Sequence, residues 1–298
     1  MMHVITNLCI EFRESIGNKM AEIAFRFDID SHKCIREGVP ILLRISDECG
    51  APFSFYVNAG KAVSISDTLK SMMNKRQAGQ VKDIKMLSAK EKLGTADYIF
   101  AAIVNPPMTQ YADNLRAIWN SSCEMGLHGG MNHSHWYMDA DRWEIKKIKA
   151  DIEKAISNMQ KVIPEFRPLG FAAPGFVTTP EIESLLSKIG FRYTTDFHSD
   201  GKKEIVLNNN GFRSICVNMC GEPGGVAYFE HAQAAGISDD AVVDDFVNRA
   251  DKYDKLLVFD HPYFAAVQKA DLLERIIKEL IRCGHHIVTV KELCGIED

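Results

Sequence analysis

From Glu22 onwards, short apolar runs alternate with longer stretches in which apolar residues recur at helical spacing. This order is typical of strands that pair in parallel, because each helix returns the chain to the starting edge of the sheet. The expected strands are Glu22–Phe27, Ser54–Val57, Glu124–Leu127, Phe191–Thr194, Ile215–Asn218, Leu256–Phe259 and His286–Val290. The expected helices are Arg36–Cys49, Asp113–Ser121, Asp141–Val162, Pro180–Ile189, Asp239–Lys252 and Lys269–Cys283. Seven such strands favour an α/β fold in which strands and helices form a barrel over one with an open sheet.

The totals argue against several classes of function. The formal net charge of -5 gives the chain no overall attraction to nucleic acid. The eight cysteines contain no C-x-x-C pair, so they are interpreted as buried reduced thiols. No expected helix opens with a G-x-G-x-x-G or P-loop pattern, which argues against nucleotide binding.

The chain also lacks the signs of a membrane protein. No run approaches the roughly 18 apolar residues of a membrane-spanning helix. The N-terminal segment makes a poor signal peptide, because charged residues follow an apolar run that is short and interrupted. We therefore expect a cytoplasmic protein. Residues 1–19 are interpreted as a lead segment that is a candidate for disorder, and residues 20–298 as a single catalytic domain.

Two carboxylates leave the end of the first expected strand together. Alternation places Arg26, Asp28 and Asp30 on one face of this strand. In a parallel barrel the chemistry lies where strands end, so one carboxylate could bind a metal while the other accepts a proton from water. A D-x-D pair taken alone is more often a turn-capping feature.

Three histidines follow the third expected strand: His128, His133 and His135. Two imidazoles and one carboxylate would occupy one face of a divalent metal and leave positions open for water and substrate. The spacing of His128 and His133 does not suit one face of a regular helix, and the Gly129-Gly130 pair predicts an irregular turn. We prefer His133 to His135 as the second histidine ligand, and this choice stays open.

These segments carry a resemblance. RFDIDSHKCIREGVPILL and EMGLHGGMNHSHW resemble the first two motifs of the polysaccharide deacetylases, the NodB homology family. Within that family they most resemble the formamido-arabinose-phosphoundecaprenol deformylases, which share the R-x-D-x-D strand end, the R-E-G-V-P helix start and the G-L-H turn. The resemblance extends from about residue 21 to the C-terminus. It implies a distorted barrel that hydrolyses an amide on a sugar.

The resemblance assigns roles residue by residue. Asp28 is similar to the general base, and Asp30, His128 and His133 to the ligands of one divalent metal, with zinc as first candidate and cobalt, nickel, iron or manganese as alternatives. The third motif falls at residues 171–176, where Pro174 and Gly175 would help to hold the oxyanion. The fourth ends at Asp196, and the fifth contains His261. The resemblance implies that His261 protonates the departing amine and that Asp196 keeps His261 protonated.

The chain departs from the family pattern at the third motif. Many deacetylases carry an arginine there that orients the base, and Ala172 stands in its place. The deformylase branch also lacks this arginine. We hypothesise that Arg26, on the same strand face as Asp28, supplies the missing positive charge.

The leading prediction is a metal-dependent amide hydrolase that removes a formyl or acetyl group from an amino sugar carried on a lipid. A polysaccharide or small-molecule N-deacetylase is the first alternative, and a metal-binding barrel without catalysis is the second. Residues 61–92 hold eight basic and three acidic residues, or +5, with apolar residues interleaved. This basic insertion is either a solvated helical segment or a surface for peripheral contact with an anionic membrane or a phosphate-linked carrier.

Overall fold

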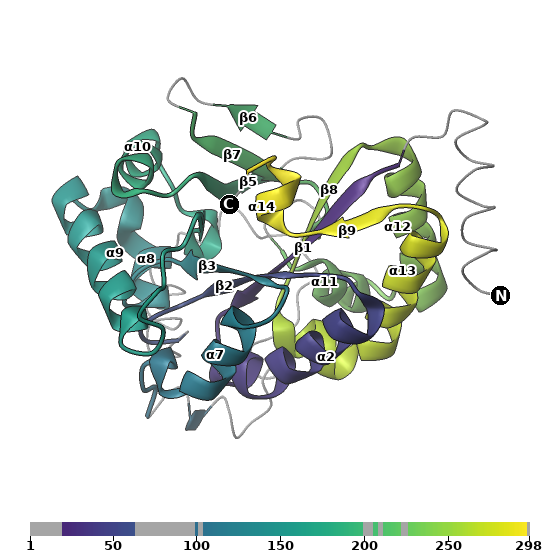
Figure 1. Ribbon diagram of the computed structural model, residues 1–298, viewed down its shortest axis with the longest axis horizontal. Coiled ribbons are helices and arrows are strands. Elements are labelled where there is room, and N and C mark those ends of the chain that lie inside the picture. Colours follow the sequence, from purple (N-terminus) through teal and green to yellow (C-terminus); the bar gives the residue numbers. More distant parts are fainter. Residues whose placement is uncertain are drawn as a thin grey trace.

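Parallel strands curve into a nearly closed barrel in the computed structural model, which describes residues 20–62, 99–100, 104–198, 205–207, 211–221 and 226–296 (Figure 1). The order around the barrel is β7-β5-β4-β3-β2-β1-β8. These strands are β1 (Glu22–Ile29), β2 (Ser54–Val57), β3 (Glu124–His128), β4 (Gly170–Ala172), β5 (Tyr193–His198), β7 (Arg213–Val217) and β8 (Lys255–Asp260). The predicted distorted barrel of seven strands is confirmed.

Two further strands pair at the margins of this barrel. β6 (Ile205–Leu207) runs antiparallel to β7, and β9 (His286–Val288) pairs parallel with the start of β1. The last expected strand is therefore real, but it lies off the path of the barrel. β4, with three residues, and β6 were not predicted.

A seam between β7 and β8 brings the two ends of the sheet together. The Met219 N–H donates to the Leu257 carbonyl at 3.0 Å, and the Phe259 N–H donates to the Met219 carbonyl at 3.0 Å. The Asn218 side chain continues this pairing, since its Oδ1 accepts from the Leu257 N–H at 2.8 Å and its Nδ2 donates to the Lys255 carbonyl at 2.9 Å. A side-chain amide thus serves as a backbone substitute where the barrel closes.

Helices pack around the outside of the barrel (Figure 1). Outward-facing residues of β1, such as Ile23, Phe25 and Phe27, belong to the apolar core between strands and helices. The helices are α2 (Val39–Cys49), α7 (Ala112–Trp119), α8 (His133–Asp139), α9 (Ile145–Gln160), α10 (Pro180–Ile189), α11 (Tyr228–Ala234), α12 (Asp239–Lys252), α13 (Ala270–Arg282) and α14 (Val290–Leu293). Among the described residues, no helix is long and apolar enough to cross a membrane. The short helices α8, α11 and α14 were not predicted, and residues 1–19 and most of the basic insertion 61–92 lie outside the described residues.

The interior of the barrel changes from apolar to polar along the strands. Ala24, from β1, belongs to a separate buried cluster with Tyr56, Tyr193 and residues of α14. Glu124, the first residue of β3, accepts from the Ser54 hydroxyl at 2.7 Å, from the Lys291 N–H at 3.0 Å and from the Tyr193 hydroxyl. α14 is therefore joined to the amino-terminal ends of the strands, and the carboxyl-terminal ends are left for the site.

Candidate metal centre

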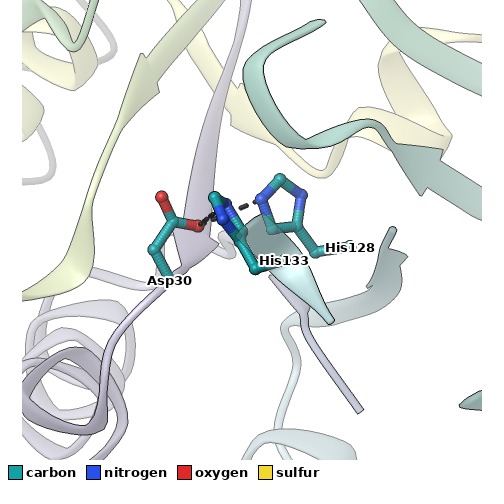
Figure 2. A group of neighbouring side chains, drawn as sticks. All are labelled: Asp30, His128 and His133. Carbon is teal, nitrogen blue, oxygen red and sulfur yellow. Dashed lines mark ion pairs between the residues drawn. The ribbon is translucent and has the colours of Figure 1, made fainter. Parts of the chain in front are cut away.

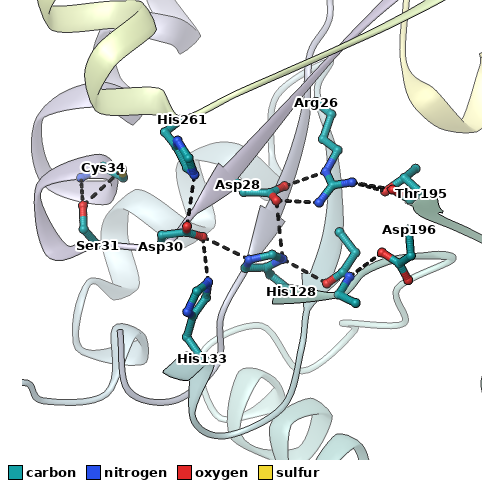
Figure 3. Close-up of polar contacts among 12 residues, drawn as sticks. Arg26, Asp28, Asp30, Ser31, Cys34, His128, His133, Thr195, Asp196 and His261 are labelled. Carbon is teal, nitrogen blue, oxygen red and sulfur yellow. Dashed lines mark hydrogen bonds and ion pairs between the residues drawn. The ribbon is translucent and has the colours of Figure 1, made fainter. Parts of the chain in front are cut away.

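Strand β1 aims three polar side chains along the inside of the barrel toward its carboxyl end. Arg26 follows the apolar Ala24 on the same face and is 0% exposed, and Asp28 is also buried. Asp30 comes directly after β1. Figure 3 shows these side chains with the residues that meet them. The strand alternation predicted for Arg26, Asp28 and Asp30 thus brings all three to one site.

Three ligand atoms converge at this end of the barrel (Figure 2). The Asp30 Oδ1 atom lies 3.0 Å from His128 Nε2 and 3.3 Å from His133 Nε2. All three atoms are buried, and they have no hydrogen-bond partner within the described part of the chain. Buried polar atoms that face one another in this way need a shared ligand, and an oxygen with two imidazole nitrogens suits a divalent cation. The residues present therefore fit a metal ion.

The other nitrogen of His128 determines which lone pair faces the cluster. His128 Nδ1 lies 2.9 Å from the Ala172 carbonyl oxygen, which can only accept a hydrogen bond. Nδ1 must therefore carry the proton, and Nε2 is left with its lone pair directed at Asp30. A metal ligand requires this tautomer.

His133 reaches the cluster because a neighbouring segment holds the loop that carries it. The Lys61 N–H donates to the Met131 carbonyl at 2.9 Å, and the His133 N–H donates to the Lys61 carbonyl at 3.2 Å. Asn132 caps α8 by accepting from the His135 N–H at 3.0 Å. His135 itself is exposed on this helix, so the structure places His133, and not His135, beside Asp30.

The Arg26 guanidinium binds the Asp28 carboxylate at two points. Its Nε and Nη2 atoms donate to the two carboxylate oxygens of Asp28 at 2.8 and 2.5 Å, and Nη1 donates to the Thr195 carbonyl at 2.5 Å and hydroxyl at 2.9 Å. Aromatic rings flank the guanidinium, with the centroids of Phe176 and Phe259 at 4.8 and 5.0 Å. Burial on its own would lower the pKa of Arg26, but Asp28 outweighs it and the pKa is raised. Arg26 is a permanent counter-ion for Asp28.

His261 approaches Asp30 from the turn after β8. Its Nε2 lies 3.1 Å from Asp30 Oδ2, and its Nδ1 lies 2.9 Å from Glu230 Oε1. Burial alone would lower the pKa of His261, yet the Glu230 and Asp30 carboxylates raise it well above its ordinary value. The buried side chain that holds the far nitrogen of His261 is therefore Glu230, from α11.

The expected contact between Asp196 and His261 is not present. The Asp196 carboxylate instead accepts from the Ala173 N–H at 2.5 Å and from the Thr194 hydroxyl. Burial raises the pKa of Asp196 to about 6, against the opposing effect of Arg26. The prediction for Asp196 was wrong in its partner, because the Asp196 carboxylate faces the Ala173 N–H next to β4, whereas His261 follows β8.

The third motif forms a tight turn beside β4. Pro174 and Gly175 lie in the short helix η4 (Pro174–Phe176), where Gly175 has φ 60°. A Cβ at Gly175 would lie 2.0 Å from the ring of Tyr137. The oxyanion role of Pro174 and Gly175 stays a prediction. Ala172, which replaces the family arginine, pairs with His128 across β3 and β4.

Glu230 is the functional candidate that sequence reasoning missed. It lies 31 residues before His261 and follows no strand. One signal was available, since Tyr228-Phe229-Glu230 places an acid directly after two aromatic residues of a helix that the barrel buries. An acid at such a position needs a partner inside the protein.

No protein-family model matches the chain, but its fold is found in solved structures. A Mycobacterium smegmatis protein assigned to the polysaccharide deacetylases is 14% identical and superposes with a TM-score of 0.60, covering 93% of this chain and 90% of its own. A peptidoglycan N-acetylglucosamine deacetylase bound to a naphthalenyl N-oxidanyl-benzamide is 10% identical, with a TM-score of 0.53 and coverages of 94% and 91%. A mutant of a family 4 carbohydrate esterase pseudoenzyme with restored activity is 10% identical, with a TM-score of 0.52 and coverages of 93% and 68%. At these identities the likeness establishes the fold, and the chain has the barrel fold of these polysaccharide deacetylase structures.

Proposed function

We propose that this protein is a metal-dependent hydrolase that removes a small N-acyl group, formyl or acetyl, from an amino sugar. The observation that carries the proposal is the convergence of three buried ligand atoms, Asp30 Oδ1, His128 Nε2 and His133 Nε2, without other hydrogen-bond partners in the described residues. A carboxylate held by an arginine lies beside this cluster, and so does His261 (Figure 3). The far nitrogen of His261 is held in turn by Glu230. A purely structural metal site does not require a base such as Asp28 and an acid such as His261 beside the metal ligands.

Asp30, His128 and His133 would hold the metal ion. When bound, a divalent cation in such a site polarises the amide carbonyl and lowers the pKa of water, so that water can attack at neutral pH. Two imidazoles and a carboxylate leave the other positions open for water and substrate. Zinc is the first candidate, followed by cobalt, nickel, iron and manganese.

Asp28 and His261 divide the proton transfers. Asp28 accepts a proton from the attacking water, and Arg26 holds its carboxylate in a fixed orientation. His261 donates a proton from Nε2 to the departing nitrogen, while Glu230 holds Nδ1. A backbone N–H near Gly175 would stabilise the oxyanion. The products are an amine and a small carboxylic acid.

The motif match supports a lipid-linked formamido sugar as the leading substrate. Arg36-Glu37-Gly38-Val39-Pro40 reproduces the R-E-G-V-P pattern of the deformylases, and Ala172 matches their lack of the third-motif arginine. Polysaccharide or small-molecule N-deacetylation would use the same residues. The fold also accommodates a pseudoenzyme, but here both the base and the acid are retained.

Elemental analysis of the purified protein provides the first test. We expect about one equivalent of a divalent metal in the wild type, with loss in Asp30→Ala, His128→Ala and His133→Ala. His135→Ala is the matched control, because it removes an exposed histidine of the same helix as His133 and should keep its metal. A wild type that stays metal-free after loading would exclude this function.

The second test separates a catalyst from a binder. Metal-loaded wild type is incubated with N-formylated and N-acetylated amino sugars, free and lipid-linked, and released formate and acetate are measured. Asp28→Asn should bind metal and release neither acid above background. Formate release from the lipid-linked sugar alone would support the deformylase, and acetate release from oligosaccharides would support the alternative.

A further inference from the structure

A single peptide group joins Asp196 to the metal ligand His128. The Ala172 carbonyl accepts from His128 Nδ1 at 2.9 Å, and the N–H of the same peptide, which belongs to Ala173, donates to Asp196 Oδ1 at 2.5 Å. Figure 3 shows this chain of contacts from Asp196 through the backbone to the imidazole. All of the groups are buried.

We propose that Asp196 is a positioning residue for the metal site, acting on His128 through the Ala172–Ala173 peptide. The inference rests on the proposed metal site and deepens it. Metal-ligating histidines usually donate their second ring N–H to a carboxylate or a carbonyl, which fixes the tautomer and raises the basicity of the ligating nitrogen. Here a carbonyl and a carboxylate are used in series.

The series arrangement strengthens the carbonyl as an acceptor. A carboxylate that accepts a hydrogen bond from an amide N–H polarises that amide, so more negative charge accumulates on the amide carbonyl oxygen. The Ala172 oxygen also accepts the Gly129 N–H at 3.0 Å, and Gly129 directly follows the ligand. One peptide therefore fixes both the ring of His128 and the turn behind it.

Local structure fixes Asp196 in this orientation. The register of β5 against β7 shifts between Thr194 and Phe197, which is an irregularity that re-aims side chains near sites. Thr194 donates its hydroxyl to Asp196, while Thr195 is bound to Arg26. Asp196 is 4% exposed, and its hydrogen bond with the Ala173 N–H connects it to the peptide that His128 contacts.

Metal affinity of the purified protein tests this role. Apo protein is titrated with Zn²⁺ in competition with a chromophoric chelator, for the wild type, Asp196→Asn and Asp196→Ala. We expect a weakening of about 10- to 100-fold for Asp196→Ala, the usual effect of removing an outer partner. The loss should be smaller for Asp196→Asn, which keeps one acceptor oxygen. Glu124→Gln is the matched control, since it removes a half-buried carboxylate at the other end of the barrel and should leave the affinity unchanged.

A measurement on metal-free protein isolates the effect on the ring. In protein labelled with ¹⁵N-histidine, the His128 Nδ1 proton, identified by its loss in His128→Ala, should be protected from exchange in the wild type. It should be lost or exchange much faster in Asp196→Ala, and remain unchanged in Glu124→Gln. Glu124 also accepts hydrogen bonds inside the protein, so a general destabilisation should affect both variants.

The outcomes separate the two hypotheses. If the wild type binds Zn²⁺ and Asp196→Ala binds it equally well with an unaltered ring proton, the inference is overturned and the proposed function stands. If the wild type binds no metal, the proposed function fails and this inference fails with it. A loss of Zn²⁺ affinity in the Asp196 variants, without a loss in Glu124→Gln, supports both the proposed metal site and the role of Asp196.

Discussion

At the scale of single residues, Arg26 combines structural and chemical tasks. Arg26 lies inside the barrel, between the apolar cluster around Ala24 and the carboxylate of Asp28, and it is 0% exposed. Its planar head makes a two-point contact with Asp28 that a lysine cannot reproduce. We hypothesise that Arg26, on β1, supplies the positive charge that many deacetylases carry at the position of Ala172, on β4.

Arg26→Ala should therefore impair both folding and turnover. The buried Asp28 would lose its counter-ion, which typically costs about 3–5 kcal/mol in the free energy of unfolding. We expect turnover to fall by at least about 100-fold, since a misplaced base forfeits proton transfer. Urea unfolding and initial rates on metal-loaded protein measure the two effects. Arg26→Lys keeps the charge and should be intermediate; undiminished turnover in folded, metal-loaded Arg26→Ala would contradict the role.

The raised pKa of Asp196 predicts a pH dependence of stability. In the folded protein burial raises its pKa to about 6, above the ordinary value of 3.8. The folded state therefore binds this proton before the unfolded chain does as pH falls. The associated stability is fully present below about pH 4 and is lost as pH rises through about 6.

Comparison with Asp196→Asn isolates this contribution. The free energy of unfolding of metal-free wild type, minus that of Asp196→Asn, should increase as the pH is lowered from about 7.5 to about 4.5. Urea titrations at a series of pH values measure the difference. A difference that is constant, or that shrinks toward acid, would show that the carboxylate is not held in an environment that opposes its charge.

The residues at strand ends were predictable, and the residues that support them were less so. Asp28, Asp30 and His128 could be found because each comes at or just after the end of an apolar run, where parallel strands present their side chains. The partner of Glu230 could not be predicted, because its approach to His261 depends on how α11 packs against β8. Asp196 is bound by the Thr194 hydroxyl and by the Ala173 backbone N–H, and a backbone N–H carries no sequence signal.

At the scale of elements, the loop before α8 decides which histidine reaches the site. The sequence indicated an irregular turn at Gly129 and Gly130, and Gly129 does have φ 66°. It did not reveal the cap at Asn132, which starts a helix at His133 and turns His135 outward. β4 was not predicted either, because three residues are too few to show the alternation of apolar and polar residues that marks a strand.

Gly60 controls the position of this loop. A Cβ at Gly60 would lie 1.9 Å from the Met131 carbonyl oxygen, a backbone atom that cannot rotate away. Gly60→Ala should displace the segment that carries His133 and weaken Zn²⁺ binding by at least about 10-fold, with a loss of about 1–3 kcal/mol in stability. Competition with a chelator measures the Zn²⁺ affinity, and urea unfolding measures the stability.

Gly50→Ala is the matched control for Gly60→Ala. Gly50 ends α2 with φ 61°, and a Cβ there would meet nothing within 4 Å. This change strains the backbone by about 1–2 kcal/mol without pushing a neighbour. It should lower stability and leave metal affinity intact. Equal metal affinity in the two variants would show that Gly60 does not control the loop.

At the scale of the whole molecule, the alternation of strands and helices predicted a barrel, but the way in which it closes was not predictable. Closure depends on the seam between β7 and β8, which are 38 residues apart at the contact of Met219 with Leu257 and are joined by only a few bonds. The pattern of apolar residues defines each strand, and it carries no information on how two sheet edges meet. The buried Asn218 supplies the missing pairing.

Asn218 should therefore contribute to stability out of proportion to its size. Asn218→Ala leaves the Leu257 N–H and the Lys255 carbonyl without their partner, and each unsatisfied buried group costs about 1–3 kcal/mol. Asn218→Asp keeps the acceptor for the Leu257 N–H, so it should still protect this amide from exchange. It loses the donor for the Lys255 carbonyl and buries a charge, so it should also lower the free energy of unfolding. Hydrogen exchange at the Leu257 amide, measured by NMR beside urea unfolding, checks both changes. Fast exchange of Leu257 in the alanine variant, with slow exchange in the aspartate variant, would establish that this side chain closes the barrel; equal protection in both would show that the Met219 backbone contacts hold the seam alone.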